Sequence, residues 1–146
     1  MSAIVFQGTS ALTLDNKWRL TVPARHRDVL VATTNGQLTL TKHPDGCLLI
    51  FPRPVWESFR ERLLTLPMSA NGWRRIFIGS AVDVDMDSAS RIHLSPELRA
   101  AAGLERQVEL VGTGRHLELW DVQRNAENEA RTRAGEMPDA VKSFVF

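Results

Sequence analysis

Two stretches of this chain share one pattern: Asp15-Asn-Lys-Trp-Arg19-Leu-Thr-Val-Pro23 and Asp87-Ser-Ala-Ser-Arg91-Ile-His-Leu-Ser95-Pro96. In each, an aspartate stands four residues before an arginine, and alternating apolar and polar residues follow. Each stretch ends on residues that favour the first turn of a helix. The two aspartates are 72 positions apart in a chain of 146 residues. A spacing close to half the chain length indicates an internal repeat.

The repeat continues downstream in the same order. Gln37-Leu-Thr-Leu40 corresponds to Gln107-Val-Glu-Leu110 at an offset of 70, and Cys47-Leu-Leu-Ile-Phe51 corresponds to His116-Leu-Glu-Leu-Trp120 at an offset of 69. No low-complexity linker separates the two halves. We therefore predict a mixed α/β protein in which two tandem modules form one pseudo-symmetric body.

Periodicity and turn signals predict the elements of the first half. We expect strands over 4–14, 20–22, 37–42 and 47–51, a short helix over 24–30, and a turn at Asn35-Gly36. A helix from Arg53 to Pro67 should bury one apolar stripe, made of Val55, Phe59, Leu63 and Leu66. Residues 69–78 should form a second helix, whose buried side carries Trp73, Ile76 and Phe77.

The second half follows the same plan. We expect strands over 81–86, 91–94, 107–111 and 116–120, a helix capped by Ser95 and ended by Gly103, and a last helix from Asp121. From about residue 131 the chain should fray. The predicted organisation is a first module with its following helix over 6–66, a connecting helix over 67–80, a second module with its helix over 81–130, and a tail over 131–146.

Composition excludes several protein classes. The net charge is +1, which excludes a uniformly basic protein but not a basic patch. The single cysteine, Cys47, excludes an internal disulfide framework and a multi-thiolate metal site, and its apolar neighbours predict a buried thiol. Because no charged leader segment and no membrane-length apolar run is present, we expect a soluble, cytoplasmic protein with no membrane partner.

A basic patch is present at the first repeat. Lys17, Arg19, Arg25 and Arg27 lie within eleven residues that contain no acid, and the formal charge is +3 up to residue 72 and −2 beyond it. A hairpin tip with Lys17 and Arg19, backed by a helix with Arg25 and Arg27, is suited to DNA, because arginine can bond guanine and lysine can neutralise phosphate. The alternative is a solvated charged face. The recurrence of the arginine as Arg91 favours the functional interpretation.

The repeated aspartates suggest a structural role. At a hairpin tip, the carboxylates of Asp15 and Asp87 can accept the loop's own N–H groups or hold the base of the arginine side chain. A paired general acid and base is the catalytic alternative. No activated nucleophile, phosphate-binding glycine loop or metal-ligand spacing accompanies them, so we assign no catalytic residue, metal, cofactor or small-molecule substrate. The histidines, His26, His43, His93 and His116, should be solvent-facing or hydrogen-bonded.

From about Phe6 to Arg124 the chain resembles the MraZ family of bacterial regulators, in the AbrB-like (SpoVT-AbrB) swapped-hairpin superfamily. The matching passages include Phe6-Gln-Gly8, Leu14-Asp-Asn-Lys17, Arg19 to Arg27, Cys47 to Pro52, Arg91-Ile92 and Leu119-Trp-Asp121. The resemblance implies two swapped-hairpin modules in a compact, β-barrel-like body with flanking helices. It also implies DNA contacts through Arg19 and Arg91, with Lys17 beside them.

The resemblance further implies a nucleoid-associated repressor of the division and cell-wall gene cluster, including its own operon, that assembles into a ring-shaped homo-oligomer on repeated promoter boxes. Members usually carry glycine before the motif arginine, whereas this chain has Trp18 and Ser90. Either the turns differ or strain is stored there, and Trp18 could pack or stack on DNA. Two other functions remain open: an oligomeric protein-interaction scaffold, and an antitoxin-like regulator, which the duplicated module disfavours.

Overall fold

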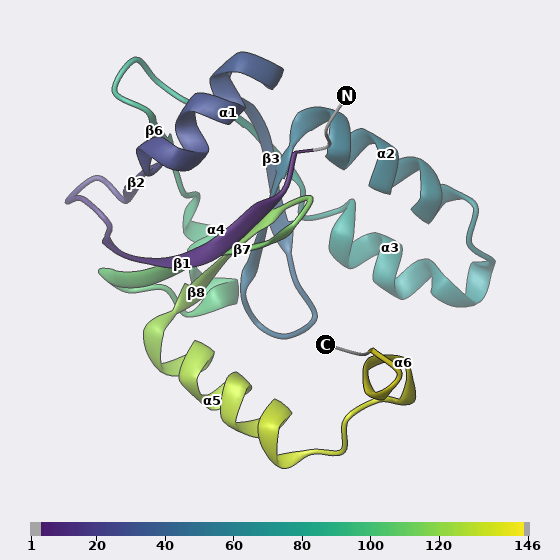
Figure 1. The fold of residues 1–146 in the computed structure, drawn as a ribbon. Helices are drawn as coiled ribbons and strands as arrows, with labels where there is room; N and C mark the ends of the chain where they lie inside the picture. Colours follow the sequence, from purple (N-terminus) through teal and green to yellow (C-terminus); the bar gives the residue numbers. More distant parts are fainter. Residues whose placement is uncertain (1–3, 145–146) are drawn as a thin grey trace.

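A computed structural model describes residues 4–144 (Figure 1). The strands are β1 (Phe6–Thr13), β2 (Arg19–Thr21), β3 (Gln37–Lys42), β4 (Leu48–Pro52), β5 (Val82–Asp85), β6 (Arg91–His93), β7 (Gln107–Gly114) and β8 (Leu117–Asp121). The helices are α1 (Ala24–Thr34), α2 (Arg53–Leu64), α3 (Asn71–Phe77), α4 (Pro96–Ala102), α5 (Val122–Ala134) and α6 (Asp139–Lys142), with a short 3₁₀ turn, η1 (Met68–Ala70), before α3.

The two halves exchange strands. Six antiparallel strands form one sheet in the order β1-β7-β8-β4-β3-β5, so β1 of the first half pairs with β7 of the second, and β5 of the second pairs with β3 of the first. The counterparts in the two halves are β1 and β5, β3 and β7, and β4 and β8. Exchanging each strand for its counterpart gives the same strand order, now read from the opposite edge of the sheet. The predicted pseudo-symmetry of the two repeats is therefore confirmed.

The remaining two strands, β2 and β6, form a separate antiparallel ribbon. Its central pair is Leu20 and Ile92, which are equivalent positions of the two halves and are fully buried. Side chains alternate between the two faces of a strand. Leu20 and Ile92 therefore anchor the ribbon to the core, and the residues on either side of them face outward.

The expected barrel is not confirmed. The six-stranded sheet ends at β1 on one side and at β5 on the other, and no strand pairing within residues 4–144 closes it. Closure needs hydrogen bonds between the first and last strands. Here the two-stranded ribbon packs on the sheet instead, through Leu20 and Ile92, which belong to the same core cluster as the leucines of the sheet.

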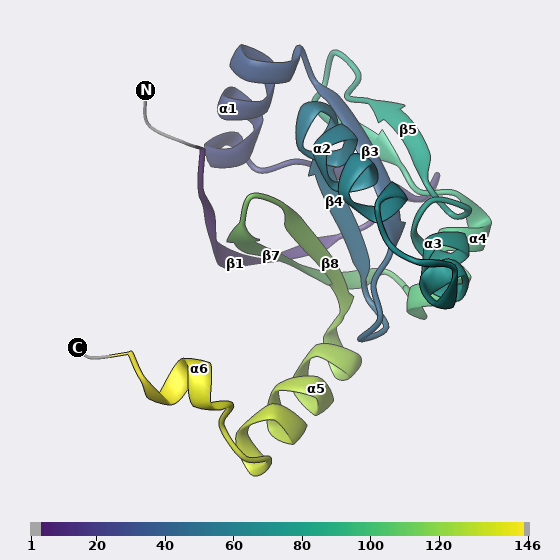
Figure 2. The same ribbon diagram turned by 90° about the vertical axis from the view of Figure 1, so that its right-hand side faces the viewer.

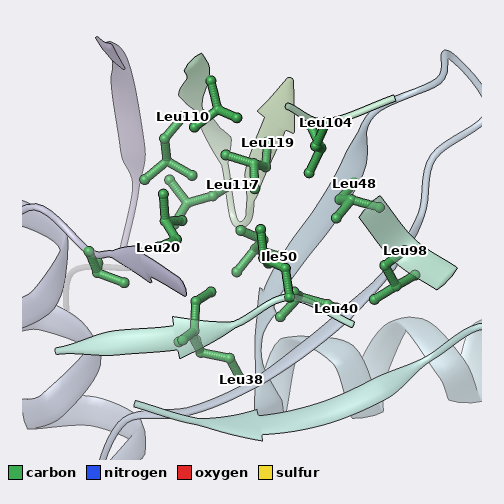
Figure 3. Packing of buried hydrophobic residues seen from close by; sticks show 14 of the residues in the cluster. Leu20, Leu38, Leu40, Leu48, Ile50, Leu98, Leu104, Leu110, Leu117 and Leu119 are labelled. Carbon is green, nitrogen blue, oxygen red and sulfur yellow. The ribbon is translucent and has the colours of Figure 1, made fainter. Parts of the chain in front are cut away.

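The core lies between the sheet and the ribbon. Leucines dominate it, and Leu20, Leu38, Leu40, Ile50 and Leu119 meet there from four strands of the sheet and ribbon and from both halves (Figure 3). A smaller aromatic cluster joins α2 to β4, with Phe51 ring centroids 5.6 Å from Trp56 and 5.3 Å from Phe59. Cys47 is buried as predicted, and burial raises the pKa of its thiol.

Two predicted helix faces are wrong in part. On α2 the buried residues are Trp56 and Leu63, while Leu66 lies beyond the end of the helix and is 43% exposed. The helix starts immediately after β4, so only the side chains nearest that strand reach the aromatic cluster. On α3, Phe77 packs against this cluster, but Trp73 and Ile76 are exposed because the short helix lies at the periphery of the body.

Several other boundaries also differ from expectation. α1 continues to Thr34 and ends at Asn35 in the left-handed conformation, so it is longer than predicted. The predicted cap Ser95 is confirmed, because its side chain accepts the Leu98 N–H. The helix predicted from Asp121 is also present, and Asp121 caps it by accepting the Arg124 N–H. The expected fraying from residue 131 is wrong within the described chain, since α5 continues to Ala134 and α6 follows. Both helices project from the body (Figure 2). Among residues 4–144, no helix is long and apolar enough to span a membrane.

Candidate nucleic-acid interface

The two Asp-x-x-x-Arg loops have the same hydrogen-bonded geometry. In the first, Asp15 Oδ1 accepts the backbone N–H groups of Lys17 and Arg19, each at 2.9 Å, and Oδ2 accepts Arg19 Nε at 2.7 Å. The second loop repeats these contacts: Asp87 Oδ1 accepts Ala89 N and Arg91 N at 2.9 Å, and Oδ2 accepts Arg91 Nε at 2.9 Å. Each carboxylate thus fixes both the turn and the base of its arginine.

These contacts keep the carboxylates ionised. The backbone N–H of Arg19 is the main cause that lowers the pKa of Asp15 to about 2, and the Arg19 side chain adds to it. The pKa of Asp87 is lowered in the same way by the Arg91 backbone N–H. Because the folded pKa lies below the ordinary value, the contribution of the loop contacts is present above that value and is lost only in strong acid.

Both loops are tight turns that end in a left-handed residue. Trp18 N donates to Asp15 O at 3.0 Å, and Ser90 N donates to Asp87 O at 2.9 Å. Trp18 has φ 61° and Ser90 has φ 63°, so both non-glycine residues occupy the conformation that glycine adopts without cost. Of the two expected possibilities, a different turn type or stored strain, the structure shows the second, at about 1–2 kcal/mol per residue.

The ribbon places the two loop arginines on one surface. In the β2–β6 register, Arg19 lies opposite His93 and Arg91 lies opposite Thr21, and all four residues alternate with the buried Leu20–Ile92 pair. The Arg19 and Arg91 side chains are therefore on the outer face of the ribbon, 26% and 33% exposed. Lys17 is exposed at the tip of the first loop.

The remaining predicted basic residues lie on α1, beside the ribbon (Figure 1). Arg25 is exposed and donates through Nη2 to Ser10 Oγ on β1 at 2.7 Å. Arg27 Nε lies 3.2 Å from Asp28 Oδ1. Of the predicted basic patch, Lys17 and Arg19 lie together in the first loop. The Arg25 side chain instead contacts β1, outside that loop.

Two arginines that sequence reasoning missed contact the first loop. The guanidinium carbons of Arg99 and Arg106 lie 4.3 and 3.7 Å from the centroid of the Trp18 ring. Arg106 Nη1 also donates to Asp15 O. Both arginines belong to the second half, more than 80 positions from Trp18, so no local pattern in the sequence could identify them.

His26 departs from its sequence prediction. It is 4% exposed, packs edge-on against Phe6 at a centroid distance of 5.6 Å, and its Nε2 has no hydrogen-bond partner among residues 4–144. Burial, with a smaller contribution from Arg25, lowers its pKa below the ordinary 6.5. His26 is therefore a neutral core residue, neither solvent-facing nor hydrogen-bonded through Nε2.

This burial predicts an acid sensitivity. As the pH falls through 6.5, His26 of the unfolded chain takes up a proton that the folded chain resists, so stability is lost. Between about pH 7.5 and about pH 5.5, the melting temperature of His26→Phe should fall less than that of wild type. Circular dichroism measures both melting temperatures. The variant His93→Phe, at an exposed histidine, is the control and should keep the wild-type loss. An equal loss in His26→Phe would contradict the prediction.

A second polar cluster lies away from the loops. Ligand atoms of His43, Cys47 and Glu118 lie within 4.8 Å of one another. His43 Nε2 is 3.3 Å from Glu118 Oε2, and this contact raises the pKa of His43. His43 Nδ1 accepts the Asp45 backbone N–H, and Glu118 accepts Trp120 Nε1. Because the imidazole and the carboxylate already have protein partners, we assign no metal to the cluster.

An apolar groove of about 870 Å³ lies between α2 and the β7–β8 turn. Leu49, Phe51, Val55, Phe59 and Phe77 line it, and Arg62 and Arg115 are at its rim. On the projecting C-terminal segment, Met137, Val141 and Phe144 are exposed, Phe144 by 78%. The body thus has a groove and a separate apolar segment that the described chain leaves uncovered.

Comparison with known protein families also finds two repeats in this chain. The family model described as "MraZ protein, putative antitoxin-like" matches twice, over residues 5–76 and 77–137. The chain belongs to the MraZ family. It is 61% identical to the transcriptional regulator MraZ of Leptothrix cholodnii and 58% identical to that of Methylibium petroleiphilum, both over the full length of each chain. The MraZ of Variovorax paradoxus is 58% identical over 97% of this chain and all of its own. The resemblance stated from the sequence is confirmed.

Proposed function

We propose that this chain regulates transcription by binding double-stranded promoter DNA through loops 15–19 and 87–91. Arg19 and Arg91 read base edges, Lys17 contacts phosphate, and Arg25 and Arg27 add flanking phosphate contacts from α1. Asp15 and Asp87 fix the loops. The proposed targets are repeated boxes upstream of the division and cell-wall gene cluster, including its own operon, where the chain acts as a nucleoid-associated repressor.

The observation that carries this proposal is the outer face of the β2–β6 ribbon. A two-stranded ribbon fits the major groove of B-DNA, and arginine can form two hydrogen bonds with guanine there. Arg19 and Arg91 share that face, and each is held at its base by an aspartate. Relatives that are 58–61% identical over their full length are named transcriptional regulators, which supports the same role for this chain.

We further propose that copies of the chain assemble, because a single copy has few means to bind tightly. Its net charge is only +1, so non-specific attraction to DNA is weak. Linking several loops in one assembly raises the effective concentration of each at a set of repeated boxes. The occupant proposed for the groove between α2 and the β7–β8 turn is the C-terminal segment 136–144 of a second copy.

The chemistry of the two surfaces supports this pairing. Phe144 and Val141 offer apolar side chains to a groove lined by phenylalanines, and the acidic Glu136 and Asp139 match the rim arginines, Arg62 and Arg115. Because the segment and the groove are different surfaces of one chain, the contact is head-to-tail, and repeated head-to-tail contacts close into rings when the rotation allows.

The test of DNA binding is a titration of the chain on DNA from upstream of its own gene, at several salt concentrations. We expect a shift that weakens steeply with salt, and a slope shallower by about one for each phosphate contact removed. Arg19→Ala with Arg91→Ala removes the base contacts and should bind more weakly, and Lys17→Ala removes a phosphate contact and should give the shallower slope. Arg133→Ala on α5 should behave as wild type. Unchanged affinity in the double variant would overturn the assignment of the loops.

The same titration separates the other functional classes. A protein-interaction scaffold would show no salt-sensitive preference for its upstream DNA and would instead retain a protein partner at high salt. An antitoxin-like regulator, which the family description also suggests, would bind DNA and in addition a toxin protein. The contact chemistry of the ribbon favours DNA binding over the scaffold, and the duplicated module disfavours the antitoxin.

A further inference from the structure

Loops 15–19 and 87–91 have the same backbone but different surroundings. In both, the left-handed residue accepts a hydrogen bond from the opposite half: Leu94 N donates to Trp18 O at 3.1 Å, and Val22 N donates to Ser90 O at 2.9 Å. Only the first loop carries an aromatic ring at this position. That ring has the guanidinium groups of Arg99 and Arg106 over it, at 4.3 and 3.7 Å.

The pseudo-symmetry shows what the second loop lacks. Leu14 N donates to Arg106 O at 2.8 Å, and the equivalent bond runs from Met86 N to Gly36 O at 2.9 Å. The position equivalent to Arg106 is therefore Gly36, which has no side chain to offer.

The position equivalent to Arg99 is Arg27, but Arg27 pairs with its neighbour Asp28 instead of contacting the second loop. Ser90 also has no ring on which a guanidinium could stack. The second loop therefore has no counterpart of either arginine contact.

We propose that Trp18, Arg99 and Arg106 form a clamp that makes loop 15–19 the rigid, base-discriminating reader of DNA, while loop 87–91 is the adaptable one. Arg106 has a second role in this clamp as a phosphate contact of the first loop. The proposal rests on the DNA-binding function proposed above and assigns different parts to its two loops.

The contacts of Arg106 support both roles. Its Nη1 donates to Asp15 O, at the first residue of the loop, while its guanidinium covers the Trp18 ring. The residue is nevertheless exposed, so it presents a positive charge beside Lys17 and Arg19.

Arg99 anchors the other side of the clamp, since its Nε donates to Leu94 O at 3.1 Å. Leu94 in turn donates to Trp18 O. The bulky residue that occupies a strained backbone position is held in addition by the two guanidinium contacts on its ring, which glycine could not make.

The first test needs no DNA. In amide hydrogen exchange, the Lys17 and Arg19 N–H groups should exchange more slowly than their counterparts, Ala89 and Arg91. Trp18→Gly and Arg106→Ala should each speed exchange in the first loop by about fivefold or more, because a stacked guanidinium restrains its ring only while both are present. Ser90→Gly, the matched change in the second loop, should leave the first loop unaffected. Equal protection of the two wild-type loops, or unchanged exchange in Arg106→Ala, would overturn the clamp.

The second test compares charge with stacking on DNA from upstream of the gene and on versions with single base-pair changes. Arg106→Lys keeps the charge but not the planar guanidinium, so the salt slope should hold while discrimination among the DNA versions falls several-fold. Arg106→Ala should lose both discrimination and about one unit of slope. Wild-type discrimination in Arg106→Lys would overturn the reader role.

These outcomes separate the clamp from the proposed function. If Arg19→Ala with Arg91→Ala loses binding while the Arg106 variants behave as wild type, the clamp fails and DNA binding through the loops stands. If wild type shows no salt-sensitive binding to its upstream DNA, the function fails, and hydrogen exchange in the free chain still decides whether the clamp exists.

Discussion

Replacing Asp15 and Asp87 together by alanine should weaken specific DNA binding on the order of a hundredfold, although it raises the net charge from +1 to +3. Each aspartate accepts two backbone N–H groups and the Nε of the loop arginine. Without the carboxylate, these donors lose their partners and the arginine must be ordered when it binds. Hydrogen bonds to a charged group are strong enough to account for about tenfold per loop.

The expected result separates geometry from charge. Added positive charge alone strengthens attraction to DNA, so a double variant that binds more weakly can only have lost the shape of its loops. Glu57→Ala with Glu129→Ala makes the same change in charge at exposed positions on α2 and α5, and should bind as well as wild type or better. The measurement is a titration on upstream DNA at one salt concentration. Binding of the aspartate variant equal to that of the glutamate control would contradict the role of the carboxylates.

The repeat and most elements could be predicted from the sequence because their causes are local. Alternation around Leu20 and Ile92, helix-start residues after each motif, and the Asn35-Gly36 turn are all visible within a few positions. The two halves use the same turn chemistry, so each supports the interpretation of the other. The sheet order follows less directly, since the exchange of β1 and β5 between halves depends on pairings that no local pattern specifies.

The parts that sequence could not predict depend on distant contacts. Arg106 meets Trp18 because Leu14 N, just before the first loop, donates to Arg106 O. Arg99 meets it because Leu94 contacts both residues: its N–H donates to Trp18 O, and its carbonyl accepts Arg99 Nε. His43 meets Glu118 only because β4 pairs with β8. Helical periodicity included Leu66 in the buried stripe of α2 and left out Trp56, because it gives the spacing of a face and not where the helix ends or which neighbour covers it.

Phe144→Ser should reduce self-association and, through it, binding to DNA with several boxes. We expect wild type to form an assembly of several copies and the variant to shift toward the monomer. The Phe144 side chain is 78% exposed in one copy and becomes buried in a neighbour's groove on assembly, and serine gives up this apolar burial. Affinity for multi-box DNA should fall by about 10²-fold or more, which is the usual scale of multivalency, whereas affinity for a single box should be unchanged. Native mass spectrometry and parallel titrations on one-box and multi-box DNA measure these effects.

Two further variants fix the site of assembly. Ser58→Trp fills the groove from an exposed position on α2 and should dissociate the assembly as Phe144→Ser does, since it blocks the other partner of the same contact. Leu64→Ser removes a similarly exposed apolar side chain that lies on α2 but does not line the groove, and should leave assembly intact. If Ser58→Trp and Phe144→Ser both assemble as wild type does, the groove does not hold the segment. If both dissociate yet keep full affinity for multi-box DNA, avidity is not the source of tight binding.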